Sequence, residues 1–599
     1  MNMQGRDIFL HSQYFSRVFM KGRYLLFIFL ASLIGLGQAN AQNATPTPTP
    51  ASVVTDPASV KPEDLKGVPE IAPAYRSDDR DLPDLGRVGI DMTRQKTLTL
   101  REAIELALDN NRDIEITRKT ARIAEFDLAS ARGFYQPRLT GQAYYDRSTI
   151  PNVSIFSSNQ KSTQGTLLGN AALQAFVPNY GTVFTGSFNN QQLTSDNPIS
   201  ILSPQLNSSL GGSVVQPLFR GRKFDVARRT IEIAKRNISL TDTQFRQRSI
   251  ETVAAVQKGY WDLTYALRNL QVQRDSVRDA KDQLAHNRRL VDEGQLAPID
   301  IVAAETQVAN FEGAVYDALN TVNLAENVLK SLISPNRNDT IWSEALTPVE
   351  PVEQATPNTT LTEAMDIAIE NRPELEINKV QKDINLLDQR LYREQKRPQI
   401  DLIASYSSAG IGGSQNPKFT SPFPLPCTVN PASPACIQQQ ANLALLTGNP
   451  LGGIFANRYP LLRVGIQFNL PLFGDKTAAA QLGHAIVEGE RIETQREQVE
   501  QSIQVDVRNA LQSIRTGEAR LRTAALVREN TARQYESEQR KLDNGQSDIY
   551  KVLERQTALA AARSAELRAR TDLNKAIAEL QRATGNSLKA NDIETKLKK

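Results

Sequence analysis

The segment Leu100-Arg-Glu-Ala-Ile-Glu-Leu-Ala-Leu-Asp-Asn110 returns later in the chain as Leu361-Thr-Glu-Ala-Met-Asp-Ile-Ala-Ile-Glu-Asn371. The offset between the two copies is 261 residues here and 254 residues at Pro217 and Pro471. A slow drift of the offset in one direction indicates a duplication followed by small deletions. The sequence therefore predicts two tandem structural repeats, with the division 97–340 for the first repeat, 341–357 for a linker, 358–585 for the second repeat and 586–599 for a C-terminal tail.

Each predicted repeat contains a short helix, a strand-rich region, a long helix, a turn and another short helix. In the first long helix, expected over 224–291, Val256, Leu263 and Leu270 recur every seven residues, which is typical of a left-handed coiled coil. At 1.5 Å per residue, such a helix is about 100 Å long. The second long helix is expected over 476–542. The short helices, such as the one predicted over 100–132, are about half as long, so two of them end to end match one long helix.

Four segments with alternating apolar and polar residues are predicted to be strands, and Val464–Leu470 alternates most clearly. Four strands cannot close a barrel, and open sheet edges are unstable in hydrocarbon. Two or more chains must then share one barrel. The segment 166–193 also alternates, and it is either an extra hairpin in the barrel wall or an external loop. The four predicted strands are 139–147, 208–216, 400–407 and 464–470.

The N-terminus has the features of a secretory signal peptide, predicted over 1–41. Lys21-Gly22-Arg23 precede an apolar run of twelve residues, and Ala39-Asn-Ala41 provides the small residues of a cleavage site. The run is shorter than the ~20 residues that a spanning helix needs, and no later apolar run approaches that length. An exported chain of this kind would enter a membrane as a closed β-barrel. Residues 42–96 are rich in proline and are expected to be a disordered leader.

The composition argues against most enzymes and against nucleic-acid binding. A net charge of +4 over 599 residues is too small for a nucleic-acid footprint. Three histidines lie far apart, two cysteines cannot build a zinc scaffold, and no Gly-rich phosphate loop occurs. We therefore expect no catalytic residues, no metal and no cofactor. Cys427 and Cys436 lie in a proline-rich insert of an exported chain, which predicts a disulfide that staples a loop.

The chain resembles the TolC-like outer-membrane efflux proteins over residues 97–585. The resemblance is carried by Leu100-x-Glu-Ala-x-x-x-Ala-x-x-x-Asn111, by Pro-Leu-Phe before each long helix, and by Gly294-x5-Asp300-Ile-Val-x-Ala-Glu-Thr306. It implies an α+β membrane protein, in which a long coiled-coil α-barrel continues into an oligomeric transmembrane β-barrel. It also implies a homotrimer in outer-membrane lipid, with twelve strands and twelve helical columns, and a large periplasmic extension. The implied function is a passive exit duct of a tripartite efflux or type I secretion system, with a periplasmic adaptor protein and an inner-membrane pump as partners.

The turns between long and short helices, 288–298 and 540–548, would form the entrance of such a duct. A ring of carboxylates at a constriction favours cations, whereas the alternative is that these charges are only solvated surface groups. In the resembling family acidic rings lie at the second turn, where Lys551 replaces the expected acid and Glu554 follows one turn later. The predicted gate residues are Asp300, Asp543, Asp548, Lys551 and Glu554; the predicted salt-bridge partners are Arg288, Arg289, Arg540 and Lys541; the predicted adaptor contacts are Gly294, Gln295, Gly545 and Gln546.

Two other functions compete with the duct. Heptads alone describe a non-conducting coiled-coil structural or adhesin-like surface protein, although a rod has no need of strands at the same place in each repeat. An exported hydrolase is the weakest hypothesis, because no two carboxylates are held in an acid/base arrangement. Trp261 and Tyr260 are expected to be coiled-coil packing residues, and His286 a solvated or capping residue.

Overall fold

The computed structural model describes residues 86–151, 160–352, 355–472 and 474–593, which belong to one unit of the chain, 80–599. The predicted signal peptide and most of the predicted leader lie outside the described residues. No helix in these ranges is both long and apolar enough to cross a membrane.

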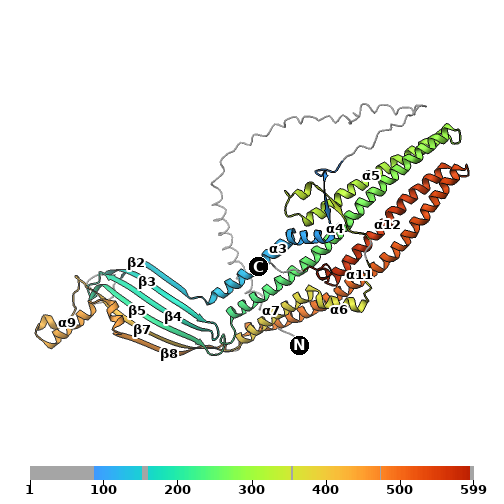
Figure 1. The fold of residues 1–599 in the computed structure, drawn as a ribbon. Helices are drawn as coiled ribbons and strands as arrows, with labels where there is room; N and C mark the ends of the chain where they lie inside the picture. Colours follow the sequence, from blue (N-terminus) through green and yellow to red (C-terminus); the bar gives the residue numbers. More distant parts are fainter. Residues whose placement is uncertain (1–85, 152–159, 353–354, 473, 594–599) are drawn as a thin grey trace, which may run out of the picture. The chain divides into compact units, whose positions relative to one another are not determined.

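Six antiparallel strands form a sheet in the order β2-β3-β4-β5-β7-β8 (Figure 1). The alternating segment 166–193, predicted to be either an extra hairpin or an external loop, provides β3 and β4 inside this sheet, so each chain has six strands in it and not only the four predicted ones. Because β3 and β4 lie between β2 and β5, these four strands form a meander. The bounds are β2 (Arg138–Pro151), β3 (Lys161–Val177), β4 (Thr182–Ser195), β5 (Leu202–Pro217), β7 (Gln399–Gln415) and β8 (Tyr459–Asn469).

The sheet has one apolar face and one polar face. Residues paired across strands lie on the same face, so Phe468 lies with Ile400, and Leu462 lies with Tyr406. The pairing continues to the other edge of the sheet and defines both faces. The apolar face carries Leu139, Tyr145, Leu167, Leu173, Phe184, Phe188, Leu210 and Val214 in addition, and the polar face carries Gln142, Asn170, Asn189, Gln191, Asn207 and Ser209.

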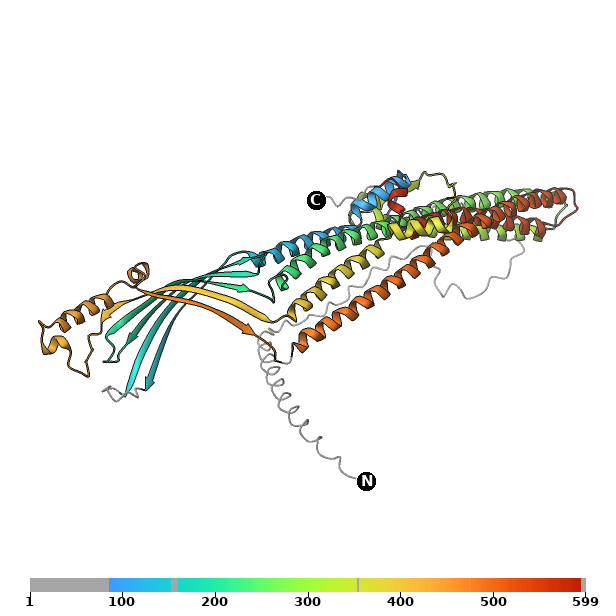
Figure 2. The ribbon, with the colours of Figure 1, turned by 90° about the horizontal axis from the view of Figure 1, so that it is seen from below.

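Strands at the edges of each repeat continue into helices after a few residues: α3 precedes β2, and β5 precedes α4. Figure 2 shows α7 leading into β7, and β8 leading into α11. Each long helix packs along one short helix near the sheet and along another toward its turn: α4 along α3 and α5, and α11 along α7 and α12. The bounds are α2 (Leu100–Asn110), α3 (Arg112–Arg132), α4 (Val226–Asp292), α5 (Pro298–Ile333), α6 (Leu361–Asn371), α7 (Pro373–Gln395), α11 (Lys476–Asp543), α12 (Ile549–Ala583) and α13 (Ser587–Ala590).

The single helix predicted over 100–132 is broken into α2 and α3 at Asn111. Asn111 has extended backbone, and its side-chain oxygen accepts a hydrogen bond from the backbone N–H of Asp113, which caps α3. Its Nδ2 donates to the carbonyl oxygen of Leu332 in α5. The break therefore lets Asn111 bond to α5. The same break occurs between α6 and α7 at Arg372.

The predicted coiled-coil seam is buried. Val256, Leu263 and Leu270 pack in one core with residues of α5 such as Val322 and Leu329. Tyr260 and Trp261 belong to the same core and have almost no exposed surface, which confirms their expected packing role.

A small parallel sheet lies beside this core. β1 (Asp91–Leu98) pairs with β6 (Glu344–Pro348), and a short 3-10 helix (Thr340–Ser343) precedes β6. The last six residues assigned to the disordered leader, and part of the predicted linker, are therefore ordered strands. Tyr260 explains this order, because its hydroxyl donates to the carbonyl oxygen of Leu98 at 3.0 Å and accepts from the N–H of Val349.

Candidate functional site

The two turns at the ends of the helical hairpins have the same backbone conformation. Gly294 and Gly545 both have positive φ, +75° and +67°. Gln295 N–H donates to the carbonyl oxygen of Leu290, and Gln546 N–H donates to that of Lys541, both at 2.8 Å. This pattern is the Schellman motif, which ends a helix and leaves its turn residues in solvent. All four predicted adaptor-contact residues, Gly294, Gln295, Gly545 and Gln546, are exposed.

An apolar cluster holds the second turn closed and also touches the first hairpin. Leu542, Ile549, Val552 and Leu553 are buried together, and Leu296, Ala303 and Tyr535 pack against them. The sequence analysis missed this cluster, because its members come from both hairpins and spacing along one helix does not show which hairpins meet. It places an apolar contact between α5 and α12 at the tip.

Two of the predicted gate residues cap helices, and a third, Lys551, is the partner of one of them. The Asp300 carboxylate accepts from the N–H of Ala297 at the start of α5, and that of Asp548 accepts from the N–H of Lys551 at the start of α12. The backbone hydrogen bond from Lys551 lowers the pKa of Asp548, and the Lys551 ammonium lies 3.2 Å from the same carboxylate. These two acids therefore stabilise the starts of their own helices.

Charged residues near the tip make contacts within and between the hairpins. Asp543 of α11 lies 3.0 Å from Nε2 of His286 in α4, so it joins the two hairpins. Arg288 reaches Glu305 of α5 at 3.2 Å, and Lys541 reaches Glu538 in its own helix at 3.3 Å. Within the described residues, the candidate cations Arg289 and Arg540 are exposed near the ends of α4 and α11. His286 and Asp543 are 257 positions apart in the sequence, so no local sequence pattern predicts their contact.

Glu554 lies in a groove between α5 and α12 close to the turns. The groove has a volume of about 480 Å³ and is lined by residues of both helices, including Ile299, Val302, Thr306 and Tyr550. Glu554 is exposed on this wall, so its carboxylate is available to solvent or to a partner. The predicted gate residue Glu554 therefore lines a groove to which both hairpins contribute.

Polar and charged contacts join α4 of the first hairpin to α12 of the second hairpin along much of their length. Lys258 pairs with Glu579 at 2.6 Å, Asp262 with Lys575 at 2.9 Å, and Asp279 with Arg563 at 3.3 Å. Burial raises the pKa of Glu579, but hydrogen bonds from Arg582 and Lys258 outweigh it, so the net shift is downward. We call these three pairs the inter-hairpin seam. By contrast, the contact of α4 with α5 is largely apolar.

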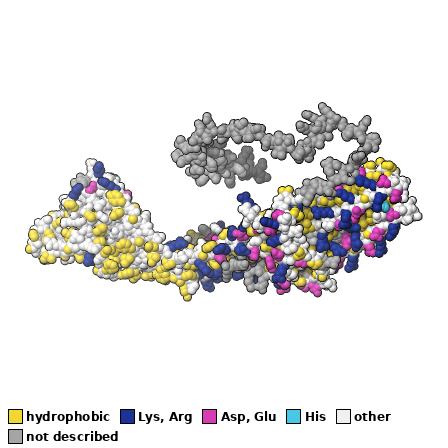
Figure 3. All heavy atoms as spheres, turned by 45° about the horizontal axis from the view of Figure 1, so that its top comes forward, with side chains coloured by type: hydrophobic (Ala, Val, Ile, Leu, Met, Phe, Trp, Pro, Cys, Tyr) yellow, Lys and Arg dark blue, Asp and Glu magenta, His cyan; other side chains and the backbone are white. Residues whose placement is uncertain are grey.

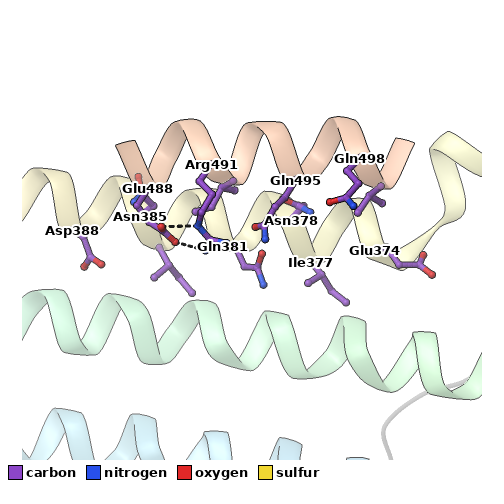
Figure 4. Close-up of a pocket in the computed structure, with 13 residues that line it drawn as sticks. Glu374, Ile377, Asn378, Gln381, Asn385, Asp388, Glu488, Arg491, Gln495 and Gln498 are labelled. Carbon is purple, nitrogen blue, oxygen red and sulfur yellow. Dashed lines mark hydrogen bonds and ion pairs between the residues drawn. The ribbon is translucent and has the colours of Figure 1, made fainter. Parts of the chain in front are cut away.

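A second groove, of about 580 Å³, lies between α7 and α11 nearer the sheet. Figure 4 shows its side chains, which come from both helices and are mostly amides and charged groups. Asn385 donates to the carbonyl oxygen of Ala485 at 2.9 Å, and a Cβ at Gly489 would lie 2.9 Å from the Asn385 side-chain oxygen. Buried amides thus hold α7 against α11, where an apolar heptad seam would otherwise be expected.

Charged side chains are dense over the helices and sparse over the sheet (Figure 3). In the described part of the chain, no group of three or more His, Cys, Asp or Glu side chains could hold a metal ion. Cys427 and Cys436 form a disulfide between α8 (Pro426–Val429) and α9 (Pro434–Leu446).

The family profile described as outer membrane efflux protein matches residues 170–334 and 364–586. The chain belongs to this family. The match falls on two separate stretches, one in each half of the chain, and confirms the resemblance inferred from sequence.

Solved structures of outer-membrane channels share the fold of this efflux-family chain. A membrane protein from Pseudomonas aeruginosa has a TM-score of 0.58 and 16% identity, over 81% of this chain and 90% of that one. The Campylobacter jejuni CmeC outer membrane channel has a TM-score of 0.56 and 14% identity, over 82% of this chain and 86% of that one. The open state of the Neisseria gonorrhoeae MtrE outer membrane channel has a TM-score of 0.55 and 16% identity, over 82% of this chain and 89% of that one. No curated protein matches the sequence significantly.

Proposed function

We propose that the protein is a passive, trimeric exit duct of a tripartite efflux or type I secretion system, gated at its periplasmic tip. The observation that carries this proposal is the six-stranded sheet, which has one apolar face, one polar face and two open edges. Apolar residues on one face of a transmembrane barrel contact lipid, whereas polar residues on the other line water. A coiled-coil rod or an adhesin does not need such a sheet, so the duct is favoured over that alternative.

The open edges support closure by copies of the same chain. All residues of the edge strands β2 and β8 are exposed. Five successive antiparallel pairings make β2 and β8 antiparallel to each other, so β8 of one copy can pair with β2 of the next copy. Such a head-to-tail contact gives a ring when the rotation between copies closes. Three chains of six strands each would give eighteen strands, a number that leaves an aqueous channel, in place of the twelve implied by the resemblance.

The helices support a tunnel continuous with this ring. In each chain, α4 and α11 carry the length of the tunnel, and the short helices stack beside them, which gives four helical columns. Three chains would supply the twelve columns expected from the resemblance. The two halves of the chain, with the same order of helices around their strands, act as two structural repeats in this assembly.

The contacts at the tip support a gate that opens by separating the hairpins. Each hairpin has an apolar core of its own. The inter-hairpin seam and the His286–Asp543 contact are polar, and at the tip a small apolar cluster also joins the hairpins, through Leu296 and Ala303. Polar contacts exposed to water contribute little net stability, so they can exchange partners when an adaptor binds the exposed turns. The hairpins would then move apart as rigid bodies, and an inner-membrane pump would supply the energy.

The test is reconstitution of the purified protein into planar bilayers, together with mass measurement of the oligomer in detergent. We expect a trimer with eighteen strands by electron microscopy and a single-channel current. An oligomer that stays in solution without detergent and passes no current would contradict the proposal and favour the structural coiled coil.

A further inference from the structure

The loop between β7 and β8 forms a small folded insert, residues 416–458, that contains α8, α9 and α10 (Pro450–Phe455). The Cys427–Cys436 disulfide joins α8 to α9. The insert has no Asp or Glu, and its two cations are Lys418 and Arg458, whereas 23% of the whole chain is charged. A segment so poor in charge is unusual for a loop that only contacts water.

The backbone of the insert lies directly on the sheet. A Cβ built at Gly410 would lie 1.8 Å from the carbonyl oxygen of Pro450, and one built at Gly412 would lie 2.1 Å from that of Gly448. Any side chain at these positions would collide with rigid backbone. Two glycines of β7 thus provide a flat seat for α10, and Ser408 strengthens it by donating to the carbonyl oxygen of Ile454 at 2.9 Å.

The seat lies on the apolar face of the sheet. Gly410 and Gly412 are an even number of residues from Tyr406, whose partner in β8 is Leu462, so all of them share one face. The Tyr406 hydroxyl also donates to Asn457 of the insert at 2.7 Å. Because α10 covers the apolar face, it lies on the side opposite to the polar face and does not plug it.

The outer side of the insert is apolar as well. Pro450, Gly453 and Ile454 are buried, whereas Leu451 and Phe455, four residues apart and thus on one face of α10, are 42% and 82% exposed. On α9, Ile437 and Leu445 are also exposed. The apolar surface of the sheet, Leu462 to Phe468, therefore continues onto α10 toward the strand ends that lie farthest from the helices.

We propose that this insert is an interfacial anchor that binds the acyl chains of the outer leaflet, with Leu451 and Phe455 as its contact residues. The proposal rests on the proposed function, because it takes the apolar face of the sheet as the lipid-facing wall. An exposed apolar helix face that carries Leu and Phe is buried at the boundary between headgroups and acyl chains. Lipid is favoured over a second copy of the chain, because the apolar surface of α10 is continuous with the face that lipid would cover.

The experiment uses tryptophan reporters in full-length protein, reconstituted into phosphatidylcholine vesicles whose acyl chains are brominated or unbrominated. Phe455→Trp tests the anchor, Val464→Trp reports on the apolar face, and Gln191→Trp on the polar face serves as the control. The two native tryptophans lie in the helical region and are measured in the unsubstituted protein. We expect bromine to quench the added emission of Phe455→Trp and Val464→Trp, and to leave that of Gln191→Trp unchanged.

The outcomes separate the two proposals. Quenching of Val464→Trp without quenching of Phe455→Trp would overturn the anchor and leave the duct standing. Loss of quenching at both positions would overturn the duct itself. If Phe455→Trp is unquenched and a photocrosslinker at position 455 captures a neighbouring copy, the occupant is a second chain and the anchor is wrong.

A second substitution tests the glycine seat. Gly410→Val should displace α10, so that the Phe455→Trp reporter loses its quenching while the Val464→Trp reporter keeps it. Gly465→Val in β8, where a Cβ meets no atom within 4 Å, is the matched control. Retention of Phe455→Trp quenching in Gly410→Val would show that the seat does not position the anchor.

Discussion

The ammonium of Lys258 in α4 donates to the carboxylate of Glu579 in α12 over 2.6 Å, and this pair joins the two helical hairpins of one chain. It belongs to the inter-hairpin seam, where polar contacts replace the apolar packing found inside each hairpin. The seam is therefore the part of the helical region whose strength should depend on pH and salt.

Acid should weaken the seam. The net pKa of Glu579 is lowered from an ordinary value of 4.5, so the folded state favours the charged form. Its stabilising effect is present above pH 4.5 and is lost as pH falls through the lower folded value. We expect the thermal midpoint to drop below pH 4.5, and Glu579→Gln, which should cost about 1 kcal/mol at pH 7, to flatten this drop. Glu536→Gln, at an exposed position of α11, is the control, and an identical acid profile in both variants would contradict the role of Glu579.

The buried carboxylate of Glu326 should be essential for the small parallel sheet. It is fully buried, it accepts from the N–H of Leu346 at 2.7 Å, and it lies 2.8 Å from Arg87 and 3.6 Å from Lys330. Glu326→Leu leaves two cations without their partner in the interior, which should cost about 3–5 kcal/mol. Urea unfolding in detergent measures the loss, with Glu125→Leu on the exposed side of α3 as the control. A cost equal to that of the control would show that the cluster does not stabilise this region.

Breaking the hairpin contacts near the tip should open the proposed gate. Arg563→Ala removes the 3.3 Å contact with Asp279, and His286→Ala removes the contact with Asp543. We expect the double variant to show longer open times in planar bilayers and to remain trimeric. Arg568→Ala is the matched control, since Arg568 pairs with Asp572 inside its own helix. Equal open times in the double variant and the control would place the gate elsewhere.

The charge at the second turn should set ion selectivity. Glu554 lies in the groove between α5 and α12. Lys551 occupies the position where an acid was expected. Reversal potentials in a salt gradient should move toward anions for Glu554→Gln and toward cations for Lys551→Glu, because a ring of charges acts on ions at a constriction. Unchanged reversal potentials in both variants would remove this turn from the constriction.

The coiled-coil helices could be predicted from sequence because their apolar residues repeat at a fixed spacing, as Val256 and Leu263 do. The sequence left the strand count open, because the segment 166–193 alternates only in part. Leu167 and Leu168 of β3 are consecutive apolar residues, and the polar stretches around them are also typical of an external loop. The break at Asn111 was also missed. It depends on a hydrogen bond to Leu332, more than two hundred residues away, whereas the apolar periodicity passes through it without interruption.

The candidate site was predicted in outline only. The turns at Gly294 and Gly545 follow from helix-ending glycines, which are local signals. The contacts across the hairpins, such as His286 with Asp543, depend on how four helices are placed side by side. Sequence spacing within one helix contains no information about that placement.

The β3–β4 hairpin has a consequence for how such a wall can evolve. Adding one strand to the sheet would reverse the direction of one edge strand. This edge strand would then be parallel, and not antiparallel, to the strand of the next chain with which it must pair. Adding two restores the direction, so the hairpin is the smallest unit by which each chain can enlarge its arc. In the proposed duct, the circumference of the ring of strands could therefore grow by two strands per chain while the number of helical columns stays the same.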